Sequence, residues 1–210
     1  LAKSLGVHYK TRSIDGIFRT LKNSFGNDFK GMPEDIAEEN FQARIRGITL
    51  MGFANKFKGM VLATSNKSEL AVGYSTIYGD MVGGFCVLKD VPKTLVYKLA
   101  KYINKKETII PNRIITREPT AELKFNQTDQ DNLPSYDILD SIINLYIEQK
   151  ISPKAIARKG FDSQVVKKVV ELIHGSEFKR RQSAPGPKIT SKAFSVDRRY
   201  PITNRYKQKI

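Results

Sequence analysis

The stretch GMVLATSNKSELAVG, residues 59–73, runs from apolar to polar side chains. Its apolar first half predicts a short buried strand, and the polar residues that follow predict a turn. Thr64 and Glu69 would then lie at the carboxyl end of a strand, where open α/β sheets bind ligands. There Thr64 can meet a phosphate or a base edge, and Glu69 can hold a magnesium ion. The same letters fit a helix start capped by Ser65 or Asn66, with Glu69 completing a capping box, and spacing alone leaves both interpretations open.

Helices and short strands alternate on both sides of this stretch. Glycine-punctuated residues 73–90 and polar residues 108–135 predict long irregular connections. The alternation favours an α/β fold with a parallel sheet. Helices are expected over residues 15–25, 33–57, 92–104, 136–149, 153–159 and 163–182, and strands over residues 7–14 and 59–64.

The sequence of 210 residues carries a formal net charge of +15. Such a balance first indicates a polyanionic partner such as nucleic acid, a membrane surface or a phosphate-rich ligand. Residues 179–210 hold +9 of that charge, however, and residues 118–148 contain seven acids against one base. This distribution excludes a basic coat over the whole molecule and indicates a mixed body with a basic C-terminal tail.

The number of cysteines excludes an intrachain disulfide and limits the metal sites that the chain can form. Cys86 is the only cysteine, so no disulfide can form within one chain, and we expect a reducing cytoplasm. With only two histidines beside it, the sequence cannot build a Cys/His zinc site. No apolar run approaches the ~18 residues that span a bilayer, so no membrane partner is expected. The opening LAKSLGVHY lacks an initiator methionine and a signal-peptide pattern, and we read it as the start of a fragment.

Polar residues near two predicted helices can hold an anionic ligand. Asn40 and Arg44 lie one turn apart on the helix over residues 33–57 and can grip one polar ligand together. A solvated helix face is the commoner reason for such spacing. Lys93 sits just inside the start of the next long helix, where its ammonium and free helix N–H groups can bind a phosphate. A solvated lysine is again the commoner interpretation.

Two loops can also contact a ligand. Residues 73–85 contain glycines that let the backbone approach closely, and Tyr74 and Tyr78 offer ring faces for stacking. These glycines do not form the G-x-G-x-x-G fingerprint, so they indicate no dinucleotide site, and a packed surface loop stays an open alternative. Thr120 lies in the polar stretch 119–123, which can close over a ligand.

Residues 151–174 favour a different function at first sight. Two helices joined by a glycine turn, with bases nearby, resemble a helix-turn-helix. Apolar residues cover much of the second helix and leave a narrow polar face, so helix packing is the favoured interpretation. The apolar residues are Val165, Val166, Val169, Val170, Leu172 and Ile173. A nucleic-acid-binding module, built on this helix pair or on the basic tail, is the alternative function.

Taken in order, several strings resemble the synthetase domain of NAD synthetases. They are ENFQARIR, LATSNKSELAVGYSTIYGDMVGGFCVLKDVPKTLVYKLA, IITREPTAEL, NQTDQDNLPSYDILDSII and SEFKRRQSAPGPKIT, and they cover most of residues 39–190. Their joint occurrence in this order is far more specific than any one of them. The string KITSKAFSVDRRYPITNRY resembles the long, glutamine-dependent bacterial branch more than the compact, ammonia-dependent one.

The resemblance implies a Rossmann-like α/β fold of the ATP-pyrophosphatase kind, related to adenine nucleotide alpha hydrolases. A parallel sheet with flanking helices would occupy residues 1–182, incomplete at the N-terminus, and an irregular basic tail residues 183–210. The implied reaction is ATP- and Mg²⁺-dependent adenylation of the nicotinate carboxylate of deamido-NAD, followed by attack of ammonia to give NAD, AMP and pyrophosphate. The implied partners are a glutaminase domain of the same parent chain, which supplies the ammonia, and a second copy in a homodimer.

The resemblance also implies roles for individual residues. Lys93 would stabilise the charge on the leaving pyrophosphate, Glu69 would also hold the magnesium ion, and no residue would act as a covalent nucleophile. The positions that match ATP contacts are Thr64, Lys93 and Thr120, and those that match deamido-NAD contacts are Asn40, Arg44, Glu69, Tyr74, Asp80 and Lys179.

Two departures from the family pattern qualify this resemblance. The Ser-Gly-Gly-x-Asp-Ser pyrophosphate loop, which belongs on the first strand of the domain, does not occur in the sequence. Phe178 stands where short-form members often have histidine. We therefore expect the chain to be the C-terminal part of a synthetase domain, and to be inactive when it stands alone.

Overall fold

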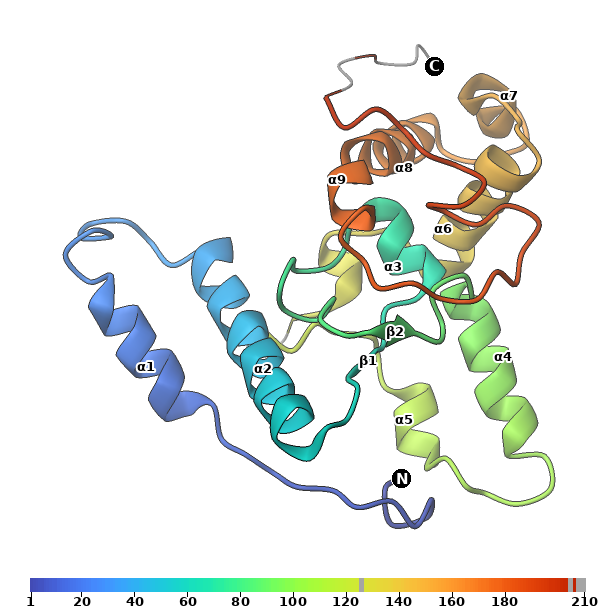
Figure 1. The fold of residues 1–210 in the computed structure, drawn as a ribbon. Coiled ribbons are helices and arrows are strands. Elements are labelled where there is room, and N and C mark those ends of the chain that lie inside the picture. Colours follow the sequence, from blue (N-terminus) through green and yellow to red (C-terminus); the bar gives the residue numbers. More distant parts are fainter. Residues whose placement is uncertain (125–126, 204–205, 207–210) are drawn as a thin grey trace.

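A computed structural model describes residues 1–124, 127–203 and 206 (Figure 1). Its sheet consists of two parallel strands, β1 (Leu62–Ala63) and β2 (Phe85–Cys86), with Leu62 paired to Phe85 and Ala63 to Cys86. The strand predicted over residues 59–64 is thus confirmed in part, because only two of its residues pair. β2 lies inside the connection that was predicted to be irregular over residues 73–90.

The strand predicted over residues 7–14 is wrong. These residues are mostly exposed and belong to no strand. Their alternating pattern has no second strand beside it in the described part of the chain, and a strand without backbone partners is not stable.

Helices make up most of the rest of the fold. They are α1 (Asp15–Ser24), α2 (Ile36–Phe57), α3 (Lys67–Val72), α4 (Lys93–Ile103), α5 (Asn112–Thr116), α6 (Tyr136–Ile143), α7 (Pro153–Ala157), α8 (Ser163–Gly175) and α9 (Glu177–Arg180). A 3-10 turn, η1 (Asp129–Asp131), precedes α6, and a π-helical turn, η2 (Asn144–Glu148), extends it. Most of the predicted helices are confirmed, with shifted ends.

Two helix boundaries differ from the prediction for local reasons. α2 begins after Asp35 rather than at Pro33, because Asp35 and Glu38 form a capping box. Asp35 Oδ1 accepts a hydrogen bond from Ala37 N, and Glu38 Oε2 accepts one from Asp35 N. The helix expected over residues 163–182 is broken at Ser176, whose backbone leaves helical geometry between α8 and α9. This break turns α9 toward α3.

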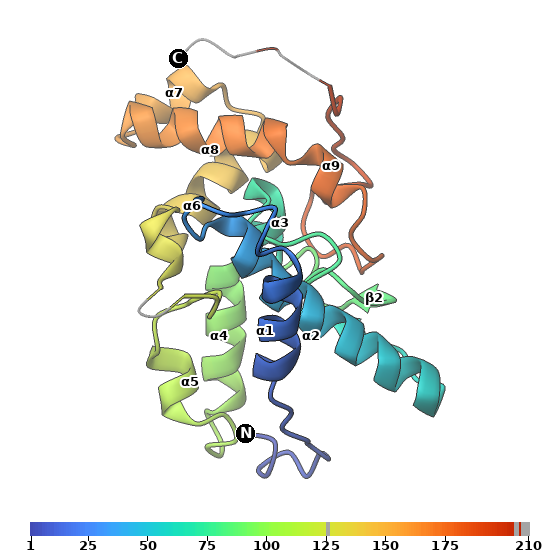
Figure 2. The same ribbon diagram turned by 90° about the vertical axis from the view of Figure 1, so that its left-hand side faces the viewer.

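The main core lies where α3, α6 and α8 meet (Figures 1 and 2). α8 buries one stripe of side chains at helical spacing: Val166, Val169, Val170 and Ile173. Each such side chain contributes roughly 1.5–3 kcal/mol when removed from water. The packing interpretation of the helix pair over residues 151–174 is therefore confirmed, because this face of α8 is turned inward.

Residues 183–203 have almost no regular structure, as predicted, but they pack against the body (Figure 1). Pro185 O accepts a hydrogen bond of 2.8 Å from Cys86 N, beside β2. Phe194 and Tyr200 belong to the main core. The tail therefore completes the fold instead of trailing into solvent.

A buried cation ties this tail to α3. The side chain of Lys67 is 1% exposed, and its Nζ lies 2.9 Å from Glu148 Oε1, 3.2 Å from Asp90 Oδ1 and 2.9 Å from Lys192 O. Thr190 also accepts a hydrogen bond from it. Because a buried charge is costly unless it is paired, this cluster holds α3, η2 and the tail in one arrangement.

α1 and α2 stand to one side of this body (Figures 1 and 2). Phe25 stacks on Phe41 with ring centroids 5.3 Å apart, which joins the two helices. Large apolar side chains remain exposed on and beside α2, among them Ile36, Ile48 and Phe57, each about two thirds exposed. Among the described residues, no helix has the length and apolar character needed to cross a membrane.

Candidate functional site

The start of α3 has the capping box predicted for Asn66 and Glu69, and it also holds Glu69 beside a cation. Asn66 Oδ1 accepts a hydrogen bond of 3.0 Å from Glu69 N, and Glu69 Oε2 accepts one of 3.3 Å from Asn66 N, so the predicted capping box is present. The second carboxylate oxygen, Glu69 Oε1, lies 2.8 Å from Lys93 Nζ. The capping role therefore uses one oxygen and leaves the other facing a cation on α4.

The N-terminus of α4 is already occupied by protein groups. Lys93 N donates to Ser68 Oγ at 2.8 Å, and Thr94 N donates to Asp140 Oδ2 at 2.9 Å. Ser68 in turn donates to the same Asp140 carboxylate. The expectation of free helix N–H groups beside Lys93 is wrong, because a serine and an aspartate from elsewhere in the chain cap this helix in place of Pro92.

The ammonium of Lys93 keeps its positive charge and faces two neighbouring side chains. It lies 5.3 Å from the centre of the Tyr136 ring and pairs with Glu69. Burial lowers the pKa of Lys93, but the Glu69 carboxylate more than offsets this, and the pKa ends above its ordinary value. Lys93 is therefore a fixed positive charge at neutral pH.

The loop after α3 gathers three of the predicted residues. Thr76 donates through Oγ1 to Asn40 Oδ1 at 2.8 Å and through its backbone N to Asp80 Oδ1 at 2.5 Å. Arg44 Nε donates to Ile77 O at 3.3 Å. Asn40 and Arg44 thus share one face of α2, as predicted, and that face meets the loop instead of facing only solvent.

The loop can approach α2 this closely because Gly47 has no side chain. A Cβ on Gly47 would lie 2.7 Å from Tyr78 O. Tyr78 itself is 70% exposed and has a φ of +63°, so its ring projects away from the body. The glycine in α2 therefore fixes where Asn40, Arg44 and Asp80 meet.

Lys179 reaches the same loop from α9. Its Nζ donates to Gly73 O and to Ser75 O, each at 2.7 Å. Burial lowers the pKa of Lys179, and the nearby Asp80 carboxylate opposes that effect. The loop is therefore held between α2 on one side and α9 on the other.

Tyr74 points inward, into a cluster that sequence reasoning missed. Tyr136 donates to Asp129 Oδ2 at 2.6 Å, and Asp129 is 4% exposed. Burial raises the pKa of Tyr74 and of Tyr136, and Asp129 adds to the effect. Because the Tyr74 hydroxyl is buried and its ring packs against the main core, the expected stacking platform is not offered by this residue.

For the residues that the sequence did not predict, Asp129 and Thr76, the sequence indicates only the local turns in which they lie. Asp129 is flanked by Thr128 and Asp131, which form a capping box, so the turn itself is readable. Nothing in the spacing indicated that this turn would bring a carboxylate beside Tyr136 and near Lys93. Thr76 is similar, because a threonine four residues before Asp80 fits an ordinary turn.

The two remaining candidates lie outside these contacts. Thr64 is exposed immediately after β1. Thr120 is partly buried, and its Oγ1 accepts a hydrogen bond of 3.1 Å from Glu122 N. In the described part of the chain, no side-chain hydrogen bond joins either threonine to the other seven residues. The stretch that carries Thr120 nevertheless lies against α2, where Gln42 Nε2 donates to Leu123 O at 2.9 Å.

The donor set suits a magnesium ion only with help from a ligand. Residues 1–124, 127–203 and 206 contain no cluster of three or more His, Cys, Asp and Glu side chains that could hold a metal. Glu69 supplies one carboxylate oxygen that is not used by the cap. Magnesium is commonly bound by one or two carboxylates together with substrate phosphates, so Glu69 fits such a site if phosphates complete it.

Comparisons with known proteins identify the family of the chain. The family model described as NAD synthase matches residues 1–183. Curated glutamine-dependent NAD(+) synthetases from Acinetobacter baylyi, Aquifex aeolicus and Thermotoga maritima are 53%, 52% and 49% identical, over 98%, 98% and 100% of this chain. The chain spans only 38%, 36% and 37% of their lengths.

Solved structures show the same likeness. A glutamine-dependent NAD+ synthetase from Acinetobacter baumannii, in complex with ADP, is 49% identical, with a TM-score of 0.55 over 97% of this chain and 36% of its own. A glutamine-dependent NAD(+) synthetase from Cytophaga hutchinsonii has a TM-score of 0.80 at 24% identity, over 97% of this chain and 35% of its own. The predicted Rossmann-like α/β fold is confirmed by these neighbours.

Proposed function

This chain belongs to the NAD synthase family, and from that premise we propose that it forms the C-terminal part of the synthetase unit of a glutamine-dependent NAD+ synthetase. That unit makes NAD from deamido-NAD by adenylating the nicotinate carboxylate with ATP and then admitting ammonia. The observation that carries the proposal is the convergence of Asn40, Arg44, Glu69, Asp80, Lys93 and Lys179 around residues 66–81.

The charges at this site suit the substrates. ATP and deamido-NAD together carry five phosphates, and Arg44, Lys93 and Lys179 are cations that reach the site from three different helices. Lys93 is proposed to stabilise the charge that builds on the leaving pyrophosphate. Its pairing with Glu69 holds the ammonium in place before substrate arrives. No covalent nucleophile is needed, because positioning and charge stabilisation can drive this transfer.

The remaining roles divide between the two substrates. Thr64, Lys93 and Thr120 are proposed to contact ATP, with the Thr120 stretch closing against α2. Deamido-NAD is proposed to lie along the loop after α3, in contact with Asn40, Arg44, Glu69, Tyr74, Asp80 and Lys179. For Tyr74 the contact is proposed through its partly buried ring edge, because its hydroxyl lies in the core.

Glu69 is also the proposed magnesium ligand. A bound magnesium ion supplies charge neutralisation on the phosphates of ATP. The oxygen that would hold the metal is Glu69 Oε1, which the capping box does not use and which pairs with Lys93. The protein's own contribution is the capping box, which keeps the Glu69 carboxylate at the start of α3.

The ammonia is proposed to come from glutamine, through a glutaminase domain of the same parent chain. Support comes from the names and lengths of the relatives, which are glutamine-dependent synthetases of which this chain spans about 37%. Because the sequence contains no Ser-Gly-Gly-x-Asp-Ser loop, the chain standing alone is proposed to be inactive. We propose that the reaction takes place in the cytoplasm, where the buried Cys86 thiol stays reduced.

Two features of organisation belong to the same proposal. The boundary between a synthetase unit over residues 1–182 and an appended tail over residues 183–210 is supported by the family match, which ends at residue 183. A homodimer is supported by the outer side of α1 and α2, which exposes apolar side chains such as Ile48. Sedimentation of the parent protein and of Ile48→Asp tests the dimer: the variant should shift to the monomer mass, and an unchanged mass would contradict this face.

The experiment for the reaction compares two Glu69 variants of the parent protein. Glu69→Gln keeps an oxygen that can accept from Asn66 N, whereas Glu69→Ala loses both that half of the capping box and the charge. NAD formation from deamido-NAD, ATP and ammonia should fall by a factor of about 100 or more in both variants. Glu171→Gln, on the exposed side of α8, is the matched control and should keep full activity. Normal turnover in Glu69→Gln would sink the assignment.

A further inference from the structure

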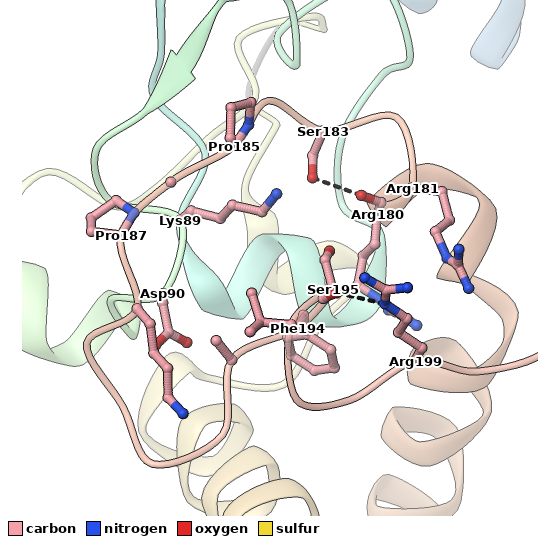
Figure 3. A pocket seen from close by; sticks show the side chains of 14 residues that line it. Lys89, Asp90, Arg180, Arg181, Ser183, Pro185, Pro187, Phe194, Ser195 and Arg199 are labelled. Atoms are coloured by element: carbon pink, nitrogen blue, oxygen red, sulfur yellow. Dashed lines mark hydrogen bonds between the residues drawn. The ribbon is translucent and has the colours of Figure 1, made fainter.

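A pocket of about 360 Å³ lies between the connection from β2 to α4 and the tail (Figure 3). Lys89 reaches into it from one side, and Phe194, Ser195 and Arg199 line it from the tail. None of the nine residues placed in the nucleotide site lines this pocket. Its size is at the lower end of ordinary ligand pockets and exceeds what a bare inorganic ion fills.

Two cations in the pocket have no acidic partner among the described residues. Lys89 Nζ donates to Ala184 O at 2.7 Å, and Arg199 Nε donates to Ser195 O at 2.6 Å. Each cation therefore donates one hydrogen bond to a neutral carbonyl, and no carboxylate balances its positive charge. Burial lowers the pKa of Lys89, as expected for an ammonium without a carboxylate nearby.

The acid that lines the pocket does not neutralise them. Asp90 Oδ2 accepts from Ile189 N at 2.8 Å and from Thr190 N at 2.7 Å, while Asp90 Oδ1 faces buried Lys67 at 3.2 Å. Its charge is thus used inside the Lys67 cluster. The pocket keeps a net positive potential, which favours an anion.

Ser195 provides a third donor that the protein leaves unused. Its Oγ is buried and has no hydrogen-bond partner in the described part of the chain, and its φ of +71° lies in the left-handed region. Buried polar atoms are nearly always paired, so an orphan hydroxyl in a pocket indicates a missing partner. A strained backbone at the same residue is typical of binding sites.

We propose that this pocket binds a phosphomonoester, with the phosphate held by Lys89, Arg199 and the Ser195 hydroxyl. Two cations and one hydroxyl in the lining of one pocket suit the three free oxygens of a phosphate better than the two of a carboxylate. The organic part lies against Pro185, Pro187 and Val196, which form the apolar wall. The site is separate from the proposed nucleotide site and does not depend on the proposed function.

The test is calorimetric titration of the full chain with phenyl phosphate, inorganic phosphate and benzoate at constant ionic strength. Phenyl phosphate should bind more tightly than either of the others. The double variant Lys89→Ala/Arg199→Ala should weaken binding of phenyl phosphate about tenfold or more, since each charge-assisted hydrogen bond carries a large share of the affinity. Ser195→Gly, which removes the orphan hydroxyl and suits the backbone, should also weaken binding while keeping the fold.

A matched control separates this site from general electrostatics. Lys98→Ala/Lys154→Ala removes two exposed cations elsewhere and should leave binding unchanged. Equal weakening in this control, tighter binding of benzoate, or no binding of phenyl phosphate to the unaltered chain would each overturn the proposal.

Discussion

The substitution Gly73→Ala, which adds one methyl group, tests the geometry of the candidate site. Gly73 ends α3 with a φ of +69°, and its carbonyl accepts from Lys179 Nζ. A Cβ at this position would lie 2.2 Å from Ser176 Oγ and 2.7 Å from Ser176 Cβ. Gly73→Ala therefore forces a methyl group into the junction between α8 and α9.

The expected cost has two parts. A non-glycine residue in the left-handed region costs roughly 1–2 kcal/mol. Overpacking of a tight contact adds roughly 1–3 kcal/mol, because neither helix backbone can give way easily. The free energy of unfolding should therefore fall by about 2–5 kcal/mol, a large share of the roughly 5–15 kcal/mol that ordinary domains possess.

Urea unfolding of Gly73→Ala, Ser176→Gly and the double variant measures both parts. In the double variant the clash is gone, so the overpacking part should be recovered while the backbone part remains. Gly52→Ala is the matched control, because a Cβ on this residue of α2 meets nothing within 4 Å, and it should leave the protein as stable or up to about 1 kcal/mol more stable. Two results would contradict this expectation. One is that Gly73→Ala unfolds at the same urea concentration as the parent, and the other is that the double variant is no more stable than Gly73→Ala alone.

Three further predictions concern the elements that support the site. Lys67→Met should lower the free energy of unfolding by about 3–5 kcal/mol in urea titrations, since it leaves buried Asp90 and partly buried Glu148 without their cation. An effect below about 1 kcal/mol would contradict the buried cluster. Burial and neighbouring arginines hold the pKa of His174 below its usual 6.5, so on acidification the unfolded chain binds a proton at His174 at a higher pH than the folded chain does. The free energy of unfolding should therefore fall as the pH drops below about 6.5. His174→Gln should flatten that part of the pH profile in thermal melts, whereas the exposed His8→Gln should not. Removal of residues 183–210 should lower the melting temperature by more than 10 °C, because it uncovers the main core, and an unchanged melting temperature would show that the tail is not part of the fold.

Sequence patterns predicted the elements whose causes are local. The helix ending at Phe57 and the buried stripe of α8 follow from apolar spacing and local capping residues, and the helix starting after Pro92 follows from its apolar spacing. The strand expected over residues 7–14 failed because a strand needs a partner, and period-two alternation alone cannot supply one. The break at Ser176 was missed because no proline interrupts residues 163–182 to mark a helix end.

The candidate site was predictable to a similar extent. Asn40 and Arg44 were placed on one helix face by their spacing, and Glu69 by its position after a strand. The contacts that make these residues one site are long-range, for example between Thr76 and Asn40. Asp129 was missed for the same reason, because its neighbour Tyr136 donates to it only after the loop before α6 has folded.

The rate of NAD formation from deamido-NAD, ATP and ammonia by the parent protein carrying Lys93→Ala tests whether this site is the synthetase centre. Lys98→Ala, on the exposed side of the same helix, is measured beside it as the control. We expect a fall in kcat of about 100- to 1,000-fold for Lys93→Ala, because it removes a charge that stabilises the transition state, and no change for Lys98→Ala. A Lys93→Ala protein that folds and turns over at the normal rate would show that the synthetase centre lies elsewhere.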